Sequence, residues 1–166
     1  MVRFKAEKQL RRKNMDVSFI NPFIKSTIET YKSMLFDDIK PLKPFLKTEP
    51  FPTYDVSATI GLSGNAQGII AVAYNMDCAV KTCSGMIGAP VAADSADLTD
   101  AIGEIVNIIA GFAKKDLTEY KLEISLPSVI TGPDHFICTP SRTHAIVVPF
   151  ETKYGKLSME VALITI

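Results

Sequence analysis

The sequence contains few of the residues that build covalent or metal crosslinks. Its three cysteines, Cys78, Cys83 and Cys138, are odd in number and do not form paired CxxC units, so neither a disulfide framework nor a structural zinc site is predicted. The two histidines, His135 and His144, lie nine residues apart without a carboxylate at metal-ligand spacing. No metal site is therefore expected, and the thiols are expected to be reduced and buried.

Long apolar segments are also missing. No stretch approaches the ~18 consecutive apolar residues that a membrane span needs, and the N-terminus lacks the apolar core of a secretory signal. These absences predict a cytoplasmic protein without a membrane anchor. Apolar residues make up 47% and charged residues 22% of the 166 residues, a composition that favours one globular domain and excludes intrinsic disorder.

Basic residues gather at one end of the chain. The formal net charge is zero, but residues 1–14 carry six Lys or Arg against one Glu, a balance of +5, so the remainder carries −5. Apart from Phe4, this leader lacks interleaved aromatic residues, and nucleic acid is not an expected partner. We interpret residues 1–14 as a basic N-terminal extension and residues 15–166 as a single domain.

Residue spacing predicts three helices, each with recognisable start or stop signals. The first is expected to begin at an Asn21 cap followed by Pro22, the second to run from Met76 to Gly88, and the third to run from an Asp97 or Thr99 cap to about Leu117.

The other segments alternate apolar and polar residues. A hairpin is expected around Gly61 and Gly64, and further strands within residues 120–132, 143–155 and 156–166. Between the first helix and the hairpin, four prolines in residues 39–53 indicate an extended linker. The mixed order of helices and hairpin-linked strands predicts an α+β fold with two layers, a largely antiparallel sheet with three main helices packed on it.

The third helix combines a broad apolar surface with one polar stripe. At ~100° per residue, Asp100, Glu104, Asn107 and Gly111 fall on one narrow strip of the helix, and apolar residues cover most of the remaining circumference. Two acids four residues apart repel slightly. This strip is therefore not optimised for helix stability. Two interpretations stay open from the residues alone: an ordinary solvent-facing strip, or a site of recognition or catalysis.

Two glycines support the second interpretation. Gly103 and Gly111 lie inside the helix, where glycine costs about 1 kcal/mol relative to alanine. A close approach of another molecule would explain them.

At these residues the sequence resembles the CheC/CheX/FliY family of chemotaxis phosphatases. The family signature is an acidic or serine residue, then Glu four residues later, then Asn after three more, then small residues; here these are Asp100, Glu104, Asn107 and Ala110-Gly111. The stretches MDVSFINPFIKSTIETYKSML, GNAQGIIAVAY and LPSVITG resemble the opening of the CheX branch, its central hairpin and the segment after its catalytic helix. The resemblance covers about residues 15–166.

The resemblance implies a phosphatase whose substrate is a phosphorylated CheY-like response regulator. Asn107 would orient the attacking water, and Glu104 would pair with a lysine of the regulator. Asp100 would support the edge of that contact, and Gly103 and Gly111 would let the partner come near. Mg²⁺ is expected in the partner response regulator, and no cofactor is expected to be bound by this chain.

The sequence also departs from the family pattern. In the CheC branch a second signature lies on the first helix, but here Glu29 is followed by Lys32 and not by asparagine, so one active face per chain is predicted. Pro127 lies twenty residues after Asn107 and is assigned a structural role. CheX-like relatives pair through sheet edges, so a homodimer is expected, with residues 159–166 as a candidate edge; a CheD-like protein is a further candidate partner.

Two other functions remain open. The chain could be a non-catalytic module that binds a receiver domain or a flagellar component through the same helix, or a structural adaptor recruited through its basic leader. An asparagine at position 107 favours catalysis, because recognition alone would not single out a carboxamide. Serine or cysteine nucleophilic catalysis is not favoured, because no nucleophile-elbow pattern marks Ser84, Ser141 or Cys138.

Overall fold

The computed structural model describes residues 17–48, 51–139 and 143–166. The predicted basic extension, residues 1–14, lies outside the described residues. In chain order the elements are η1 (Val17–Phe19), α2 (Ile20–Leu35), β1 (Lys40–Pro41), β2 (Phe45–Leu46), β3 (Tyr54–Ser63), β4 (Ala66–Tyr74), α3 (Met76–Ile87), α4 (Ala96–Asp116), η2 (Thr118–Tyr120), β5 (Glu123–Ile124), β6 (Ser128–His135), β7 (Ile146–Thr152) and β8 (Gly155–Thr165).

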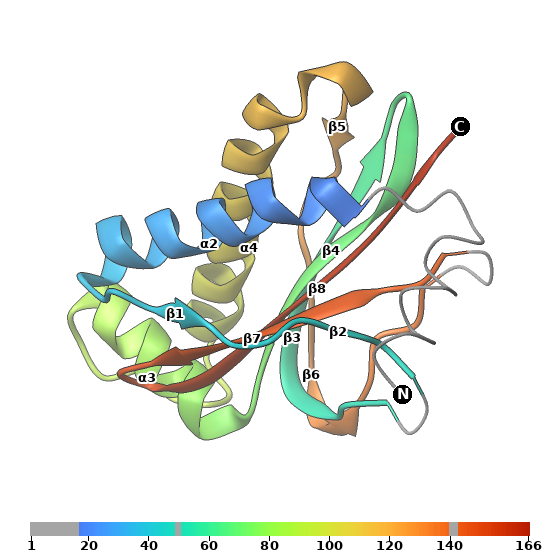
Figure 1. The fold of residues 1–166 in the computed structure, drawn as a ribbon. Helices are drawn as coiled ribbons and strands as arrows, with labels where there is room; N and C mark the ends of the chain where they lie inside the picture. Colours follow the sequence, from blue (N-terminus) through green and yellow to red (C-terminus); the bar gives the residue numbers. More distant parts are fainter. Residues whose placement is uncertain (1–16, 49–50, 140–142) are drawn as a thin grey trace.

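The strands form one sheet in the order β1-β7-β8-β4-β3-β5, in which β2 also pairs with β7 and β6 also pairs with β3. Every pairing is antiparallel. Helices α2, α3 and α4 lie on the same side of the sheet (Figure 1). The predicted α+β architecture is therefore confirmed. Among the described residues, none of the helices combines the length and apolar composition that crossing a lipid bilayer requires.

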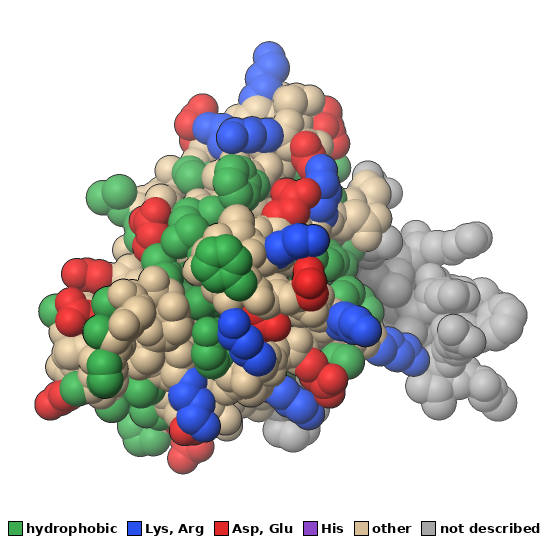
Figure 2. All heavy atoms as spheres, turned by 90° about the vertical axis from the view of Figure 1, so that its left-hand side faces the viewer, with side chains coloured by type: hydrophobic (Ala, Val, Ile, Leu, Met, Phe, Trp, Pro, Cys, Tyr) green, Lys and Arg blue, Asp and Glu red, His purple; other side chains and the backbone are tan. Residues whose placement is uncertain are grey.

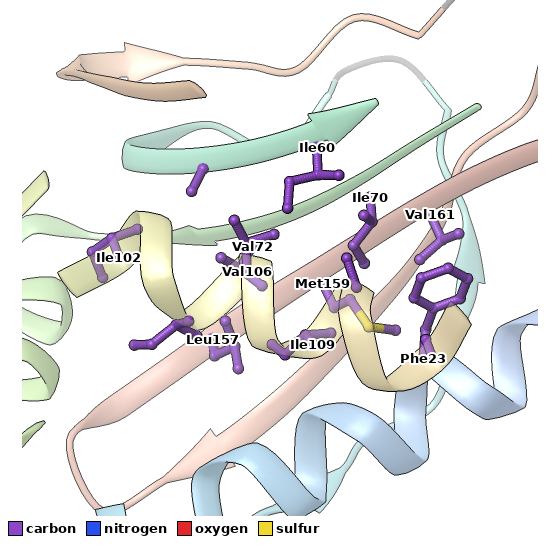
Figure 3. Packing of buried hydrophobic residues seen from close by; sticks show 14 of the residues in the cluster. Phe23, Ile60, Ile70, Val72, Ile102, Val106, Ile109, Leu157, Met159 and Val161 are labelled. Carbon is purple, nitrogen blue, oxygen red and sulfur yellow. The ribbon is translucent and has the colours of Figure 1, made fainter. Parts of the chain in front are cut away.

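The main core lies between the helices and the sheet. Alternate residues of the central strands, such as Ile60 of β3 and Met159 of β8, are buried beneath the helices, as period-two alternation requires. Figure 3 shows the α4 side chains Ile102, Val106 and Ile109 directed toward these strands. Helix α4 is thus enclosed by the sheet on one side and by α2 on another.

A smaller buried cluster covers the opposite face of the sheet. It contains Tyr54, Ala71, Ala73 and Ile137. Tyr54 lies two residues before Val56, which belongs to the main core, yet the pairing register with β6 shifts between these two residues. A bulge of this kind changes the direction of a side chain, and it accounts for the two residues packing on different faces.

The first helix begins earlier than predicted. Helix α2 starts at Ile20, directly after the short η1 turn, and its N-cap Phe19 makes no side-chain capping bond. The expectation that Asn21 caps this helix was wrong. Pro22 is the third helical residue, where a missing backbone N–H removes no intrahelical hydrogen bond.

The second helix confirms its predicted limits. The Asn75 side chain accepts a hydrogen bond of 2.8 Å from the backbone N–H of Cys78 and caps α3. Gly88 ends the helix with φ of +78°, a conformation that favours glycine. The predicted hairpins are confirmed as β3–β4 and β7–β8.

The proline-rich linker contributes to the sheet, which was not predicted. Its two short strands add to β7, with Lys40 opposite Glu151 and Phe45 opposite Val147. Both lie at the outer edge of the sheet. Proline is tolerated there because an edge strand leaves one side without ladder hydrogen bonds.

The final strand is central over most of its length. β8 lies between β4 and β7, and residues 157–161 pair with both. The expectation that residues 159–166 offer an edge for dimer formation was therefore wrong for residues 159–161. Residues 162–165 pair with β4 alone, so an edge there stays a prediction. The edges of the sheet are formed by β1 and β2 on one side and by β5 and β6 on the other. A homodimer through one of these edges stays a prediction.

Candidate functional site

The candidate site lies on helix α4. The Ser95 side chain caps this helix by accepting a hydrogen bond of 3.3 Å from the backbone N–H of Leu98. Neither predicted cap is used: the helix begins at Ala96, so Asp97 is its second residue and Thr99 its fourth. An acidic residue in the first turn interacts favourably with the helix dipole.

Helix α4 is packed on its flanks and back, as the sequence predicts. Nine of its 21 residues are buried, and they come from the faces that contact the sheet and α2. These residues are Leu98, Ala101, Ile102, Gly103, Ile105, Val106, Ile109, Ala110 and Ala113. The helix is therefore anchored by its packed faces, which hold the backbone of its open face in place.

The predicted polar strip lies on that open face. Asp100 and Glu104 are exposed, and Asn107 and Gly111 are partly exposed. Within the described part of the chain, the side chains of Asp100, Glu104 and Asn107 have no hydrogen-bond or ion-pair partner. Two carboxylates and one carboxamide are thus brought together and remain available to an approaching molecule.

The two glycines differ in their surroundings. A Cβ atom at Gly111 would meet nothing within 4 Å, so this position leaves open space on the helix surface. Gly103 is buried, and a Cβ there would lie 3.4 Å from Cγ2 of Val129 and 3.6 Å from Cγ of Pro127. The close approach at Gly103 is therefore made by β6 and its preceding loop, which differs from the expectation that Gly103 faces a partner protein.

The segment from β5 to β6 borders the strip on one side. Lys114 of α4 pairs with Glu123 of β5 at 3.1 Å, and Pro127 packs near Gly103 further up the helix. This packing agrees with the structural role assigned to Pro127. Helix α2 lies on the other side of α4, where Lys25 pairs with Asp116 at 3.0 Å.

The equivalent region of α2 carries no second polar strip of this type. Glu29 is exposed, and Lys32 pairs with Asp38 at 3.4 Å. A single active face per chain remains the prediction.

One histidine has a partner that the sequence did not reveal. The Nε2 atom of His135 lies 2.7 Å from the Ser57 hydroxyl, and Nδ1 lies 2.7 Å from the carbonyl oxygen of Gly132. Nδ1 donates to the carbonyl oxygen, which can only accept, and Nε2 forms the hydrogen bond with the hydroxyl. Ser57 is fully buried and cannot reach a substrate, so this pair holds β6 to β3. Nothing in the local sequence marks it, because the two residues are 78 positions apart.

The cysteines divide into two groups. Cys78 and Cys83 are buried, and burial raises the pKa of Cys83 to about 12 and also raises the pKa of Cys78. Cys138 is exposed, so the expectation that all three thiols are buried was wrong for this one. Across the described ranges, no three His, Cys, Asp or Glu residues form a group that could hold a metal ion.

Solved structures share this arrangement of sheet and helices. A CheC-like superfamily protein from Shewanella sp. PV-4 is 31% identical, with a TM-score of 0.83 over 90% of this chain and 99% of that chain. The chemotaxis protein CheX from Vibrio vulnificus is 28% identical, with a TM-score of 0.82 over 89% of this chain and 100% of that chain. The protein thus has a CheC-like fold with a polar strip on its central helix.

Sequence comparison identifies the family within this fold class. The family described as chemotaxis phosphatase CheX matches residues 56–151, a range that contains the whole of α4. A protein of Thermotoga maritima named CheY-P phosphatase CheX is 28% identical over 123 residues, which cover 72% of this chain and 79% of that protein. The chain belongs to the CheX family of chemotaxis phosphatases.

Proposed function

We propose that this chain is a phosphatase that hydrolyses the phospho-aspartate of a CheY-like receiver domain. Membership of the CheX family supports this proposal, as does the Thermotoga relative named a CheY-P phosphatase. The observation that carries it is Asn107. Its carboxamide stands on the open face of a helix whose flanks and back are packed, and it has no hydrogen-bond partner among the described residues.

The chemistry requires a water molecule in line with the bond to be broken. The water oxygen forms a bond to phosphorus while the bond from phosphorus to the aspartate oxygen breaks, which yields inorganic phosphate and a carboxylate, and the water proton passes to the phosphate. A carboxamide can accept a hydrogen bond from the water and donate one to the phosphoryl group. Asn107 can therefore orient the nucleophile without changing its own protonation state.

Glu104 is proposed to hold the two proteins in register. Its exposed carboxylate would form a charge-assisted hydrogen bond with a lysine of the receiver domain, and Asp100, one helical turn away, would extend the acidic contact. The open space at Gly111 allows the partner backbone to come near. The Mg²⁺ that stabilises the leaving carboxylate is proposed to belong to the receiver domain.

The test is the rate at which a phosphorylated, Mg²⁺-loaded CheY-type receiver domain decays in the presence of each variant. Asn107→Ala should remove most of the acceleration, on the order of 10²-fold or more, as expected for one preorganised transition-state group. It should retain binding to the receiver domain loaded with beryllofluoride. Glu104→Ala should weaken both binding and acceleration. Asn21→Ala, a change of the same type at an exposed position of α2, should behave like wild type.

Two results would overturn the proposal. If Asn107→Ala accelerated decay as well as wild type, the catalytic assignment would be wrong. If wild type bound the receiver domain without accelerating decay, the chain would be a non-catalytic binding module.

A further inference from the structure

A leucine beside the candidate site is almost entirely exposed. Leu126 lies in the three-residue connection between β5 and β6, and 88% of its surface is accessible. Isolated exposed leucines are common on proteins, so exposure by itself indicates little. Leu126 differs from such residues because its loop is held by hydrogen bonds and lies beside the polar strip of α4.

The connection is fixed at both ends. The backbone N–H of Ser125 donates to the carbonyl oxygen of Gly61 at 3.0 Å, and the N–H of Gly61 donates back to the Ser125 hydroxyl at 2.9 Å. The Ser125 hydroxyl in turn donates to the Leu126 carbonyl oxygen at 2.8 Å. On the other side of Leu126, Pro127 packs beside Gly103 of α4. The leucine is therefore presented by a backbone that is anchored to β3 and to α4.

The two contacts with α4 define where Leu126 lies along the helix. Glu123 pairs with Lys114, and Pro127 packs near Gly103. The helix between its two contact residues is about 16 Å long at ~1.5 Å per residue, and the extended segment between its two is about 13 Å long at ~3.3 Å per residue. The two lengths are similar, so the segment runs alongside the helix. Leu126, one residue before Pro127, lies beside the helical turn that carries Asn107.

Acidic and apolar groups consequently stand together around the site. Asp100 and Glu104 lie on the exposed face of α4, and Leu126 borders that face. Figure 2, which views the helical side of the molecule, shows hydrophobic and acidic side chains along its left-hand part, while most Lys and Arg lie toward the middle and right. Apolar groups surrounded by charged ones are typical of a protein-binding surface.

We propose that Leu126 is the apolar anchor with which this chain docks on the phosphorylated receiver domain, and that it inserts into an apolar depression beside the phosphorylation site. The inference rests on the proposed function and names a specificity-determining residue for it. Because the loop is already ordered, binding loses little conformational entropy there. Leu126 does not reach the reacting atoms, so it contributes to affinity and not to the chemical step.

The test compares Leu126→Ala, Leu126→Met and Phe45→Ala. Phe45 is 44% exposed and lies at the opposite edge of the sheet, so it serves as the matched apolar control. Leu126→Ala should raise the KM for the phosphorylated receiver domain, and the Kd for the beryllofluoride-loaded form, about tenfold with kcat unchanged. Leu126→Met and Phe45→Ala should remain within about twofold of wild type.

The contrary results separate this inference from the proposed function. If wild type accelerates decay and Leu126→Ala has an unchanged KM and Kd, the anchor is wrong and the phosphatase assignment stands. If Leu126→Ala instead converts a dimer to a monomer by light scattering and binds the receiver domain like wild type, Leu126 belongs to self-association and the anchor is again wrong. If wild type neither binds nor accelerates decay of the receiver domain, both proposals fail.

Discussion

The Lys47 ammonium lies 2.6 Å from the Glu160 carboxylate on the sheet face opposite the helices, although the two side chains are only 4% and 2% exposed. The Tyr54 hydroxyl donates to the second carboxylate oxygen at 2.8 Å, and Lys47 also donates to the carbonyl oxygen of Ile137. The cluster joins β3 and β8 to the segments that follow β2 and β6. Every buried side-chain polar atom among the described residues has a partner, and here the partners come from distant parts of the chain.

Removing one member of this pair should destabilise the protein strongly. Lys47→Met leaves the Glu160 carboxylate buried without its counter-ion, and the expected loss in free energy of unfolding is about 3–5 kcal/mol. The double variant Lys47→Met/Glu160→Leu should lose much less, since no unpaired charge is then buried. Urea denaturation of the single and double variants measures both values. A double variant that loses as much free energy of unfolding as Lys47→Met, or more, would show that the two groups do not act as a pair.

Alanine at the two glycines of α4 should separate stability from docking. Gly111→Ala should raise the free energy of unfolding by up to about 1 kcal/mol through helix propensity, but its methyl group would enter the open space beside Asn107 and should raise the Kd for the receiver domain. Gly103→Ala meets ordinary contact distances inside the protein and should leave the Kd unchanged. Thermal unfolding and binding measurements on both variants test this contrast, which disappears if Gly111→Ala binds like wild type.

Alkaline conditions should weaken the fold through the buried thiols. Burial holds the pKa of Cys83 at about 12, whereas the ordinary value is 9.0. Between these values the unfolded chain binds fewer protons than the folded protein, so stability is fully present below pH 9 and falls as pH rises toward 12. The expected slope is about 1.4 kcal/mol per pH unit for this thiol. Cys83→Ala should show a shallower decline between pH 9 and 10.5 in denaturant titrations; equal slopes would contradict the assignment.

Local signals predicted much of the fold. Asn75 and Gly88 define the ends of α3 because capping and positive φ depend on residues within one turn. Alternation of apolar and polar residues identified the strands of the hairpins, because a strand with one buried face shows this alternation within its own sequence. The strip of Asp100, Glu104 and Asn107 was also recognisable, because the helical period alone places these residues on one face. The family resemblance supplied their roles, which remain proposals.

Long-range packing decided the rest. Gly103 looked like part of an open face, but Pro127, which approaches it, is 24 residues away in the sequence. The final strand looked like a free edge, and only the pairing order of the sheet places its residues 157–161 between β4 and β7. The partnership of Lys47 with Glu160 spans 113 residues. The sequence by itself determined the three main helices, the two hairpins and the polar face of α4, because these properties are local. The tertiary structure decided that the proline-rich linker joins the sheet, which faces are covered and which loop stands beside Asn107, because those depend on contacts between segments that no local pattern encodes.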